Sequence, residues 1–361
     1  MRIVHVINDA TIGGAQTFVE GLAGNWDITG DELHLVVLRG ADSLSARYSQ
    51  AFVSVTYLDV AGNPLRAALT YRRVLRTLRP DVVHSHLLQS DLVSLLLTPR
   101  RARRISTVHT TGLSKADPVL SRAVARVVGR LSGGFVAAVA CNETCLRYTG
   151  SMGYRATMHV IENGLPVPAT TSYDPDSTMF LSLARLHPMK GHAILVRAFA
   201  EIADELPGWN LTCVGSGVTP DAGDLADVLE MPRVRQLMSE GRLRLEGPTL
   251  EPERYLEGAA ALVISSTYGE ASPMVAIEAV SMAVPVLTTA VGGGPALMAG
   301  SLPVAAPGST ESLARMLRAF AALSVGERVE LSKWSRAQAI DKFDVRGRVL
   351  SYRSVYQGGA S

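Results

Sequence analysis

The sequence alternates between short apolar runs and segments with a helical period, and this alternation limits the possible folds more than any other feature. The apolar runs are rich in β-branched residues and nearly continuous, as in strands that are covered on both faces. Strands that alternate with helices favour a doubly wound α/β fold with parallel sheets. The expected strands are 2–7, 33–38, 52–58, 81–86, 104–109, 135–140, 157–161, 179–184, 210–215, 241–246, 261–266 and 284–289, and residues 63–78 are a typical expected helix.

One proline-rich segment interrupts the alternation. Residues 162–178 contain three prolines and no apolar period, so we interpret most of this segment as a linker. A chain of 361 residues is long enough for two domains. The crevice between two such α/β domains is the default ligand site. The expected parts are an N-terminal domain (1–165), a linker (166–178), a C-terminal domain (179–344) and a final helical segment (345–361) that packs back on the first domain.

Composition excludes several protein classes. Apolar residues make up 47% of the chain and charged residues 19%, which indicates a core-rich globular protein and not a disordered one. No apolar run approaches the roughly 18 residues of a membrane span, and the N-terminus resembles a first strand more than a signal peptide. The three cysteines make no disulfide framework, and no Cys or His pair completes a metal site with them. We therefore expect a cytoplasmic location, with a peripheral position on the inner membrane face as an alternative.

Charge is distributed unevenly along the chain. Residues 1–165 carry 18 basic and 12 acidic side chains, whereas residues 166–361 carry 17 and 21. Arg122, Arg126 and Arg130 are four residues apart and so share one helical face. Such a face is either solvated or contacts an anionic partner, for example a phosphorylated acceptor or a membrane surface. Nucleic acid is not expected, because no aromatic residues are interleaved with the arginines.

The stretch YGEASPMVAIEA (268–279) combines a helix start with two carboxylates. Ser272 is predicted to cap the helix and Pro273 to open it, which leaves free amides in a first turn that favours anions. Glu270 precedes this turn, and Glu278 follows Pro273 by about 7–8 Å along the helix. A nucleotide sugar has a matching layout of sugar hydroxyls, diphosphate and ribose diol. Alternatively, Glu278 pairs with a basic residue in the core, and the local sequence leaves both interpretations open.

Two other loops carry groups that suit a phosphorylated ligand. In RLHPMKGH (185–192), Arg185 and Lys190 flank a turn after an expected strand, and together they suit a diphosphate. In NDATIGGAQTFVE (8–20), Gly13 and Gly14 would let the backbone approach a ligand closely. The second loop is not GxGxxG, so a nicotinamide fingerprint is not favoured.

Taken together, these motifs resemble those of the group 1 retaining glycosyltransferases, a nucleotide-sugar-dependent family with the GT-B fold and an EX7E motif. Arg185-x4-Lys190 and Glu270-x7-Glu278 carry the resemblance. Further matching segments are the Gly13-Gly14 loop, DVVHSH (81–86), TVHTTG (107–112), ENGL (162–165), VGSG (214–217) and PVLTTAVGG (285–293). Their order and spacing make the match specific. The resemblance implies two Rossmann-like α/β/α domains that face an interdomain cleft.

The resemblance also implies roles for individual residues. Glu278 would accept hydrogen bonds from the ribose, and Glu270 would hold hydroxyls of the donor sugar. Arg185 and Lys190 would bind the diphosphate, and His109 would reach the donor sugar from the first domain. The residues expected to bind the nucleotide sugar are Gly13, Gly14, Arg185, Lys190, Gly215, Ser272, Pro273, Met274, Val275 and Glu278, and those expected to act in catalysis are His109, Arg185, Lys190 and Glu270.

Two positions depart from the family pattern, and no metal is expected. Ala296 stands where the family often has Glu, which bears on the loop after Gly293 and on donor preference. Cys141 replaces a frequent Ser. The sequence DPD (174–176) resembles a metal-binding DxD, but it lies in the expected linker, where a turn is the better interpretation.

The expected reaction is transfer of a sugar from a nucleoside-diphosphate sugar to an acceptor hydroxyl, with the anomeric configuration kept and without a cofactor. UDP is the expected nucleotide because of its frequency among such donors. Acceptors could be glycans, lipid-linked molecules or natural products, with His84, His86 and the loop 110–118 as acceptor-side candidates, and loops 213–217 and 243–249 near the donor. Alternatives are a phosphorylase or epimerase with the same fold, or a non-catalytic nucleotide-sugar binder.

Overall fold

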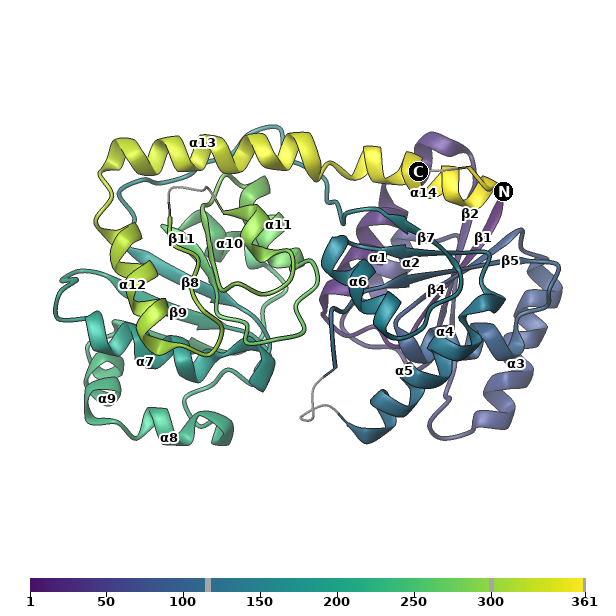
Figure 1. The fold of residues 1–361 in the computed structure, drawn as a ribbon, viewed down its shortest axis with the longest axis horizontal. Coiled ribbons are helices and arrows are strands. Elements are labelled where there is room, and N and C mark those ends of the chain that lie inside the picture. Colours follow the sequence, from purple (N-terminus) through teal and green to yellow (C-terminus); the bar gives the residue numbers. More distant parts are fainter. Residues whose placement is uncertain (114–117, 299–301, 360–361) are drawn as a thin grey trace. The chain divides into compact units, whose positions relative to one another are not determined.

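The computed structural model describes residues 1–113, 118–298 and 302–359, and the chain divides into two compact units (Figure 1). The first unit is formed by Met1–Pro166 together with Phe343–Ser361, and the second by Val167–Lys342. Residues 343–361, most of which we expected to pack back on the first domain, thus belong to the first unit. Within the described ranges no helix is both long and apolar enough to cross a membrane.

A parallel seven-stranded sheet forms the centre of the first unit. Its strands lie in the order β3-β2-β1-β4-β5-β6-β7, and its first six follow the doubly wound order of dinucleotide-binding folds. The strands are β1 (Arg2–Ile7), β2 (Glu32–Val37), β3 (Ser54–Tyr57), β4 (Val82–His86), β5 (Arg103–Val108), β6 (Ala137–Ala140) and β7 (Thr157–Val160). Residues of β1 and β4 are buried along nearly their whole length, as expected for strands covered on both faces.

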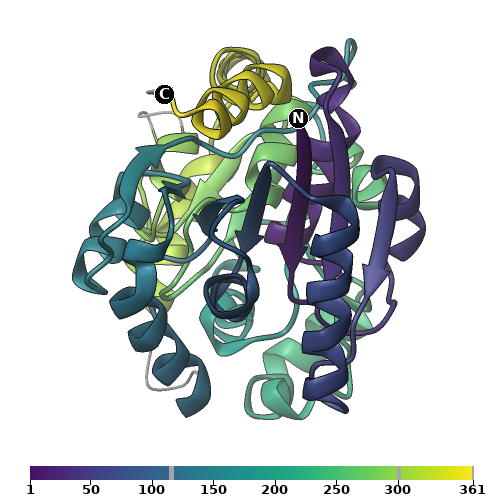
Figure 2. The same ribbon diagram turned by 90° about the vertical axis from the view of Figure 1, so that its right-hand side faces the viewer.

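The helices of the first unit follow the strands in alternation (Figure 2). They are α1 (Gly14–Gly24), η1 (Trp26–Thr29), α2 (Ser45–Ala51), α3 (Pro64–Leu78), α4 (Leu88–Leu97), α5 (Val119–Leu131), η2 (Ser132–Gly134), α6 (Glu143–Ser151) and α14 (Val345–Gln357). Local sequence explains where α3 starts, because the Asn63 side chain accepts a hydrogen bond from the Arg66 amide (3.0 Å) and Pro64 fits the first turn. Ala67, Tyr71 and Leu75 recur every four residues and bury one face of α3.

The C-terminal helix α14 is fixed to the first unit by polar and aromatic contacts. The Arg353 Nε donates to Asp31 Oδ2 (3.0 Å), and the ring of Tyr356 stacks on Trp26 with centroids 5.5 Å apart. Just before the helix, the Leu165 amide donates to the Phe343 carbonyl (2.9 Å). The segment ENGL (162–165), identified in the sequence as a motif, is therefore where the chain meets its own C-terminal part.

The second unit is built on a parallel five-stranded sheet in the order β10-β9-β8-β11-β12. The strands are β8 (Met179–Leu183), β9 (Asn210–Val214), β10 (Leu243–Glu246), β11 (Ala261–Ile264) and β12 (Val286–Thr288). The helices are η3 (Pro188–Lys190), α7 (His192–Ile202), η4 (Gly223–Leu225), α8 (Ala226–Leu229), α9 (Pro232–Ser239), α10 (Pro252–Glu257), α11 (Met274–Ser281), η5 (Gly294–Leu297), α12 (Thr310–Ala321) and α13 (Val325–Lys342).

An aromatic cluster forms part of the second unit's core. Phe180 of β8 stacks on Trp209 with ring centroids 4.5 Å apart, and Phe320 of α12 packs against both rings. The Arg328 guanidinium lies 4.8 Å from the centre of the Trp209 ring. Helices α7 and α12 pack side by side over this part of the sheet. The cluster anchors β8, whose carboxyl end carries the loop with Arg185 and Lys190.

Candidate functional site

The loops after β8 and β11 are joined by hydrogen bonds at the carboxyl ends of these neighbouring strands. The Thr267 amide donates to the Met189 carbonyl (2.7 Å), and the Ser265 hydroxyl donates to the Lys190 carbonyl (2.7 Å). The first loop holds Lys190 and the second leads to Glu270. The carboxyl edge of a parallel sheet is where α/β folds place their ligands. The fold therefore positions two of the predicted site residues at one edge.

Lys190 and Glu270 form an ion pair in this position. The Lys190 Nζ lies 2.5 Å from Glu270 Oε2, which also accepts a hydrogen bond from the Ser266 hydroxyl (2.8 Å). The side chains are mostly buried, with 19% of Lys190 and 10% of Glu270 exposed. The sequence predicted both residues as ligands of a nucleotide sugar but did not predict that they contact each other. An ammonium and a carboxylate 80 positions apart in the sequence meet only through the tertiary fold.

The helix α11 begins one residue later than the sequence predicted. Pro273 occupies the N-cap position with an extended backbone, and no side chain caps the helix, so the prediction that Ser272 is the cap was wrong. The first intrahelical bond is donated by the Ala276 amide to the Pro273 carbonyl (3.0 Å). The amides of Met274 and Val275 precede that bond, and they lie in the turn whose dipole favours an anion.

A small pocket in the second unit collects four of the predicted residues: Lys190, Glu270, Pro273 and Val275. Its remaining walls come from the carboxyl ends of β8 and β11 and from the residues that follow them. The pocket thus combines a cation, a carboxylate and the start of a helix. The other lining residues are Ser182, Leu183, Ala184, Val263, Ile264, Ser265 and Ser266.

The other predicted donor residues of the second unit lie outside the pocket's lining. Arg185 is exposed after β8, and Ser272 and Met274 flank the start of α11. Glu278 lies one turn further along α11, with its side chain partly exposed. Gly215 follows β9 with φ +157°, and a Cβ there would overlap the Ala184 carbonyl oxygen, so this close approach of two strand ends requires glycine.

Gly292 was part of a recognised motif, but its structural role was missed. It has φ +59°, and a Cβ at this position would overlap the carbonyl oxygen of Glu270. The neighbouring Gly293 amide donates to the Ala271 carbonyl (2.8 Å). The loop after β12 therefore packs directly on the backbone that carries Glu270. The run of three glycines at 292–294 was the available signal. Ala296, the departure from the family pattern, is exposed in η5.

In the first unit, histidine side chains form a chain of contacts from the core toward the surface. His5 Nδ1 lies 3.0 Å from His86 Nε2, and His86 Nδ1 lies 3.2 Å from His109 Nε2. His84 contacts the Tyr356 hydroxyl (2.6 Å) and the Thr107 hydroxyl (2.7 Å). His109 is partly exposed, whereas His5, His84 and His86 are fully buried.

Burial keeps these histidines neutral at pH 7. Removal from water lowers the pKa of His5 to about 3 and that of His109 to about 4. It also lowers the pKa of His84 and His86 well below the ordinary value. The acceptor-side prediction for His84 and His86 needs correction, because fully buried rings cannot contact an acceptor directly.

The buried histidines also offer a geometry that could hold a metal ion. One ring nitrogen each of His5, His84 and His86 lies within 4.8 Å of the others. His84 is already engaged by hydroxyl groups at both ring nitrogens, and His86 by histidines at both. The arrangement is thus a hydrogen-bonded core cluster. Of the ring nitrogens of these three histidines, only His5 Nε2 is buried without a hydrogen-bond partner among the described residues.

The remaining predictions for the first unit concern two loops. Gly13 precedes α1 in an extended conformation, and Gly14 is exposed as its first residue. In the acceptor-side loop 110–118, residues 114–117 lie outside the described residues. The part before this gap is held in place by Cys145 of α6, whose thiol donates to the carbonyls of Val108 (3.1 Å) and Thr110 (3.4 Å).

Known proteins match this chain in sequence and in structure. The family model for Glycosyltransferase Family 4 matches residues 12–167, and that for Glycosyl transferases group 1 matches residues 177–322. An uncharacterized glycosyltransferase from Methanocaldococcus jannaschii is 29% identical over 120 residues. That match covers 33% of this chain, and it spans only 28% of the relative's length.

Several solved structures share the fold over the whole chain. HepE from Anabaena, in complex with UDP and glucose, matches with a TM-score of 0.81 and 18% identity over 99% of this chain and 100% of that one. Sucrose-phosphate synthase from Thermosynechococcus elongatus matches with a TM-score of 0.79 and 18% identity over 99% of both chains. A glycosyltransferase from Rickettsia africae matches with a TM-score of 0.78 and 16% identity over 99% of this chain and 98% of that one. The fold is the GT-B fold, and the two family models, each of which matches one part of the chain, support a glycosyltransferase of the group 1 type.

Proposed function

We propose that the protein transfers a sugar from a UDP-sugar to an acceptor hydroxyl and keeps the anomeric configuration. The observation that carries this proposal is the buried Lys190–Glu270 pair beside the start of α11. A cation and a helix N-terminus suit a diphosphate, and a carboxylate suits sugar hydroxyls. The structures of HepE with UDP and with UDP-glucose support the choice of nucleotide.

The ion pair gives the second unit a way to recognise the donor. When the donor binds, Lys190 exchanges the Glu270 carboxylate for the diphosphate, and Glu270 then accepts hydrogen bonds from the sugar. Both groups keep a partner throughout, which matters because an unpaired buried charge is costly. The amides of Met274 and Val275 add donors to the diphosphate, and Glu278 accepts hydrogen bonds from the ribose.

The chemical step needs charge stabilisation at the leaving group. The bond between the anomeric carbon and the diphosphate oxygen breaks, and the acceptor oxygen bonds to the same face of that carbon. The acceptor proton passes to the departing phosphate, whose negative charge Lys190 stabilises. Double displacement would need a nucleophilic carboxylate, and Glu270 is the only carboxylate among the described residues that line the pocket. Glu270 is paired with Lys190, so we favour the front-face route.

Donor consumption tests the proposal directly. The purified protein would be incubated with sugar nucleotides of UDP, GDP, ADP and dTDP, with a panel of hydroxyl acceptors, and release of nucleotide would be measured. We expect release from UDP-sugars, and we expect Glu270→Gln to lower kcat by about 10²-fold or more. Glu330→Gln is the matched control, because Glu330 is exposed on α13 of the same unit. Full turnover in Glu270→Gln would contradict its role.

A non-catalytic nucleotide-sugar binder is the second candidate, because Ala296 replaces a frequent family Glu. Such a protein would be stabilised by UDP in a thermal-shift assay yet would consume no donor with any acceptor. Restoring the acidic residue with Ala296→Glu provides a further comparison. A gain of turnover from zero would show that this position limits catalysis.

A further inference from the structure

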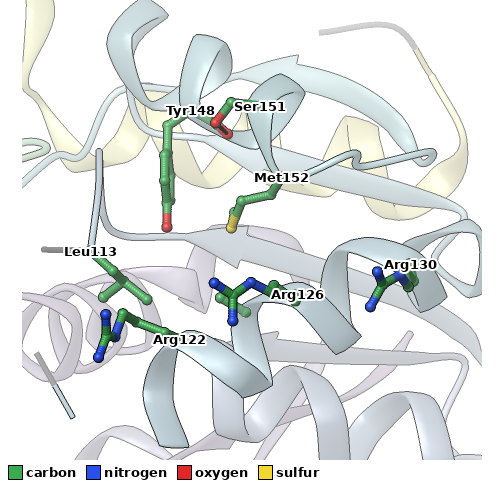
Figure 3. Close-up of a pocket in the computed structure, with 8 residues that line it drawn as sticks. Leu113, Arg122, Arg126, Arg130, Tyr148, Ser151 and Met152 are labelled. Carbon is green, nitrogen blue, oxygen red and sulfur yellow. Dashed lines mark hydrogen bonds between the residues drawn. The ribbon is translucent and has the colours of Figure 1, made fainter. Parts of the chain in front are cut away.

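A cavity in the first unit is not used by the donor proposal. It has a volume of about 340 Å³ and lies between α5 and α6 (Figure 3). Figure 3 shows three arginines in a row along α5, with Tyr148 and Met152 opposite them. The lining residues are Leu113, Arg122, Ala125, Arg126, Arg130, Tyr148, Ser151 and Met152.

The three arginines give the cavity a strong positive charge. Arg122, Arg126 and Arg130 are spaced by four residues, so α5 presents them on one face. Among the described residues, no acidic side chain lines the cavity and none of the three arginines forms an ion pair with a carboxylate. Three guanidinium groups held together repel one another unless an anion lies between them. The cavity therefore suits a ligand with more than one negative charge.

Arg122 adds a second observation that points to a ligand. Its side chain is partly buried, and its Nε is a buried donor without a hydrogen-bond partner among the described atoms. A buried donor without a partner costs free energy. The planar guanidinium fork matches the oxygens of a phosphate, which could bind two donors at once.

The opposite wall limits what else the ligand contains. Leu113 and Met152 provide apolar surface there, Ala125 adds to it from α5 itself, and all three belong to or border the small core cluster between α4 and α5. A volume of about 340 Å³ is near the lower end for small-molecule sites. It accommodates a phosphate and a short carbon body next to it.

The cavity is connected to the loop that carries His109. Leu113 lies four residues after His109 in the loop that follows β5. The Cys145 thiol ties α6, which forms one wall, to the carbonyls of Val108 and Thr110 in the same part of the chain. A molecule in the cavity would thus lie beside Leu113, which is part of the predicted acceptor-side loop.

We propose that this cavity binds a phosphate group of the acceptor, so that the preferred acceptor is a phosphorylated molecule. The identification of the bound molecule as the acceptor rests on the proposed glycosyl transfer, whereas the phosphate site itself does not depend on that function. The phosphate could belong to a soluble molecule or to a lipid headgroup. The apolar side chains Val119, Val127 and Leu131 are exposed on the same helix, so the test includes lipid.

The experiment measures phosphate binding in matched variants. Inorganic phosphate is titrated into the wild type, Arg122→Ala/Arg126→Ala and the control Arg72→Ala/Arg76→Ala, which removes two exposed arginines of the same spacing from α3. Lys190→Ala reports any phosphate bound at the donor site. We expect the α5 variant to weaken phosphate binding by about tenfold or more, and the α3 control to leave it unchanged. Equal phosphate affinity in the wild type and the α5 variant, or no binding at all, overturns the proposal.

Vesicles distinguish the two sources of phosphate. Phosphatidylcholine vesicles with and without phosphatidylglycerol are sedimented with the same proteins. Sedimentation with phosphatidylglycerol that needs the α5 arginines, together with binding of free phosphate, assigns a lipid source. Phosphate binding without sedimentation assigns a soluble one. Sedimentation without phosphate binding indicates attraction to surface charge alone and overturns the site.

Turnover separates this inference from the proposed function. If the protein consumes donor, the α5 variant is expected to raise KM for a phosphorylated acceptor by about tenfold and to leave KM for its dephosphorylated form unchanged. If no donor is consumed but the α5 arginines bind phosphate, the proposed function fails and the phosphate site stands.

Discussion

The two units hold their positive charges in different ways. In the second unit, Lys190 is mostly buried and paired with the Glu270 carboxylate, and the Ser266 hydroxyl contacts the same oxygen. In the first unit, three arginines line one cavity and pair with no carboxylate among the described residues. A paired buried lysine must exchange partners to bind an anion, whereas the arginines can bind one without losing an ion pair. Under the two proposals, donor binding in the second unit would depend on this exchange of partners, whereas phosphate binding in the first would depend on charge attraction.

The first unit also holds more buried histidines than the second. His5 of β1 and both His84 and His86 of β4 are buried, and His109 extends the group toward the surface. In the second unit His192 is buried at the start of α7. Both units contain a buried acidic side chain paired with a cation, Asp31 in the first and Glu270 in the second, but the first unit buries a larger group of neutral histidines.

The largest expected effect follows from removing the paired cation. Lys190→Ala would lower kcat/KM for donor turnover by about 10²–10³-fold, because the diphosphate loses its cation in the transition state. The same change leaves the buried Glu270 carboxylate without its ion-pair partner, so stability should be measured alongside activity. Lys333→Ala, at an exposed position of the same unit, is the control. Retained turnover in Lys190→Ala would remove the ion pair from the mechanism.

Acid should destabilise the first unit more than the second. The unfolded chain binds protons at histidines near pH 6.5, whereas burial lowers the folded pKa of His5 to about 3 and of His109 to about 4, and lowers those of His84 and His86 as well. Each of these histidines contributes stability that is present above pH 6.5 and lost as the pH falls toward its folded pKa. The loss between about pH 6.5 and pH 5.5 is about 1 kcal/mol for each.

One buried acid opposes this loss. Burial raises the pKa of Asp91 to about 7, so between about pH 4 and pH 7 the folded protein keeps a proton that the unfolded chain has lost. Asp91 therefore adds about 1 kcal/mol as the pH falls over the same interval, which leaves a net loss of about 3 kcal/mol from these five groups of the first unit. His192, with its pKa lowered to about 4, predicts a loss of about 1 kcal/mol in the second. Hydrogen exchange followed by peptide would compare the units, and equal losses would contradict the difference.

A smaller effect is expected from a change in the loop that supports Glu270. Gly292→Ala would lower the free energy of unfolding by about 1–3 kcal/mol, because the position has φ +59° and its Cβ would overlap the Glu270 carbonyl oxygen. Displacement of this backbone should also weaken donor binding. Gly326→Ala on α13 is the control, since a Cβ there has no neighbouring atom within 4 Å. Denaturant unfolding measures both variants, and equal stability would show that the loop adapts without cost.

The smallest effect concerns salt. Raising the ionic strength from about 0.1 M to about 1 M shortens the Debye length from about 10 Å to about 3 Å. Arg126 and Arg130 are exposed, so phosphate binding in the α5–α6 cavity should weaken several-fold. Donor binding at the mostly buried Lys190 should change less. Calorimetric titrations at both salt concentrations test this, and an equal salt dependence would contradict the proposed contrast.

The sequence predicted strands and long helices well, because their patterns are local. Residues 2–7 form β1 as predicted, and residues 64–78 form α3 one residue after the predicted start. The predicted strand 52–58 is shorter in the structure, since β3 spans Ser54–Tyr57. The final helix 345–357 was recognised because it follows an already complete second core. These features depend on periodicity, which one sequence shows directly.

Predictions that depended on tertiary contacts were less successful. His84 and His86 share one face of β4 because they are two residues apart, but the sequence did not show that β1 places His5 beside them. The Lys190–Glu270 contact depends on the pairing of β8 with β11. The spacing of the α5 arginines predicted a common face, but the opposite wall from α6 could not be read from spacing.

Titration of UDP into the purified protein by calorimetry is the most direct test of the donor site at the second sheet's carboxyl edge. The account predicts that wild type and Lys333→Ala bind UDP equally and that Lys190→Ala binds it about tenfold more weakly or worse. Unchanged UDP affinity in Lys190→Ala, or no UDP binding by the wild type, would contradict it.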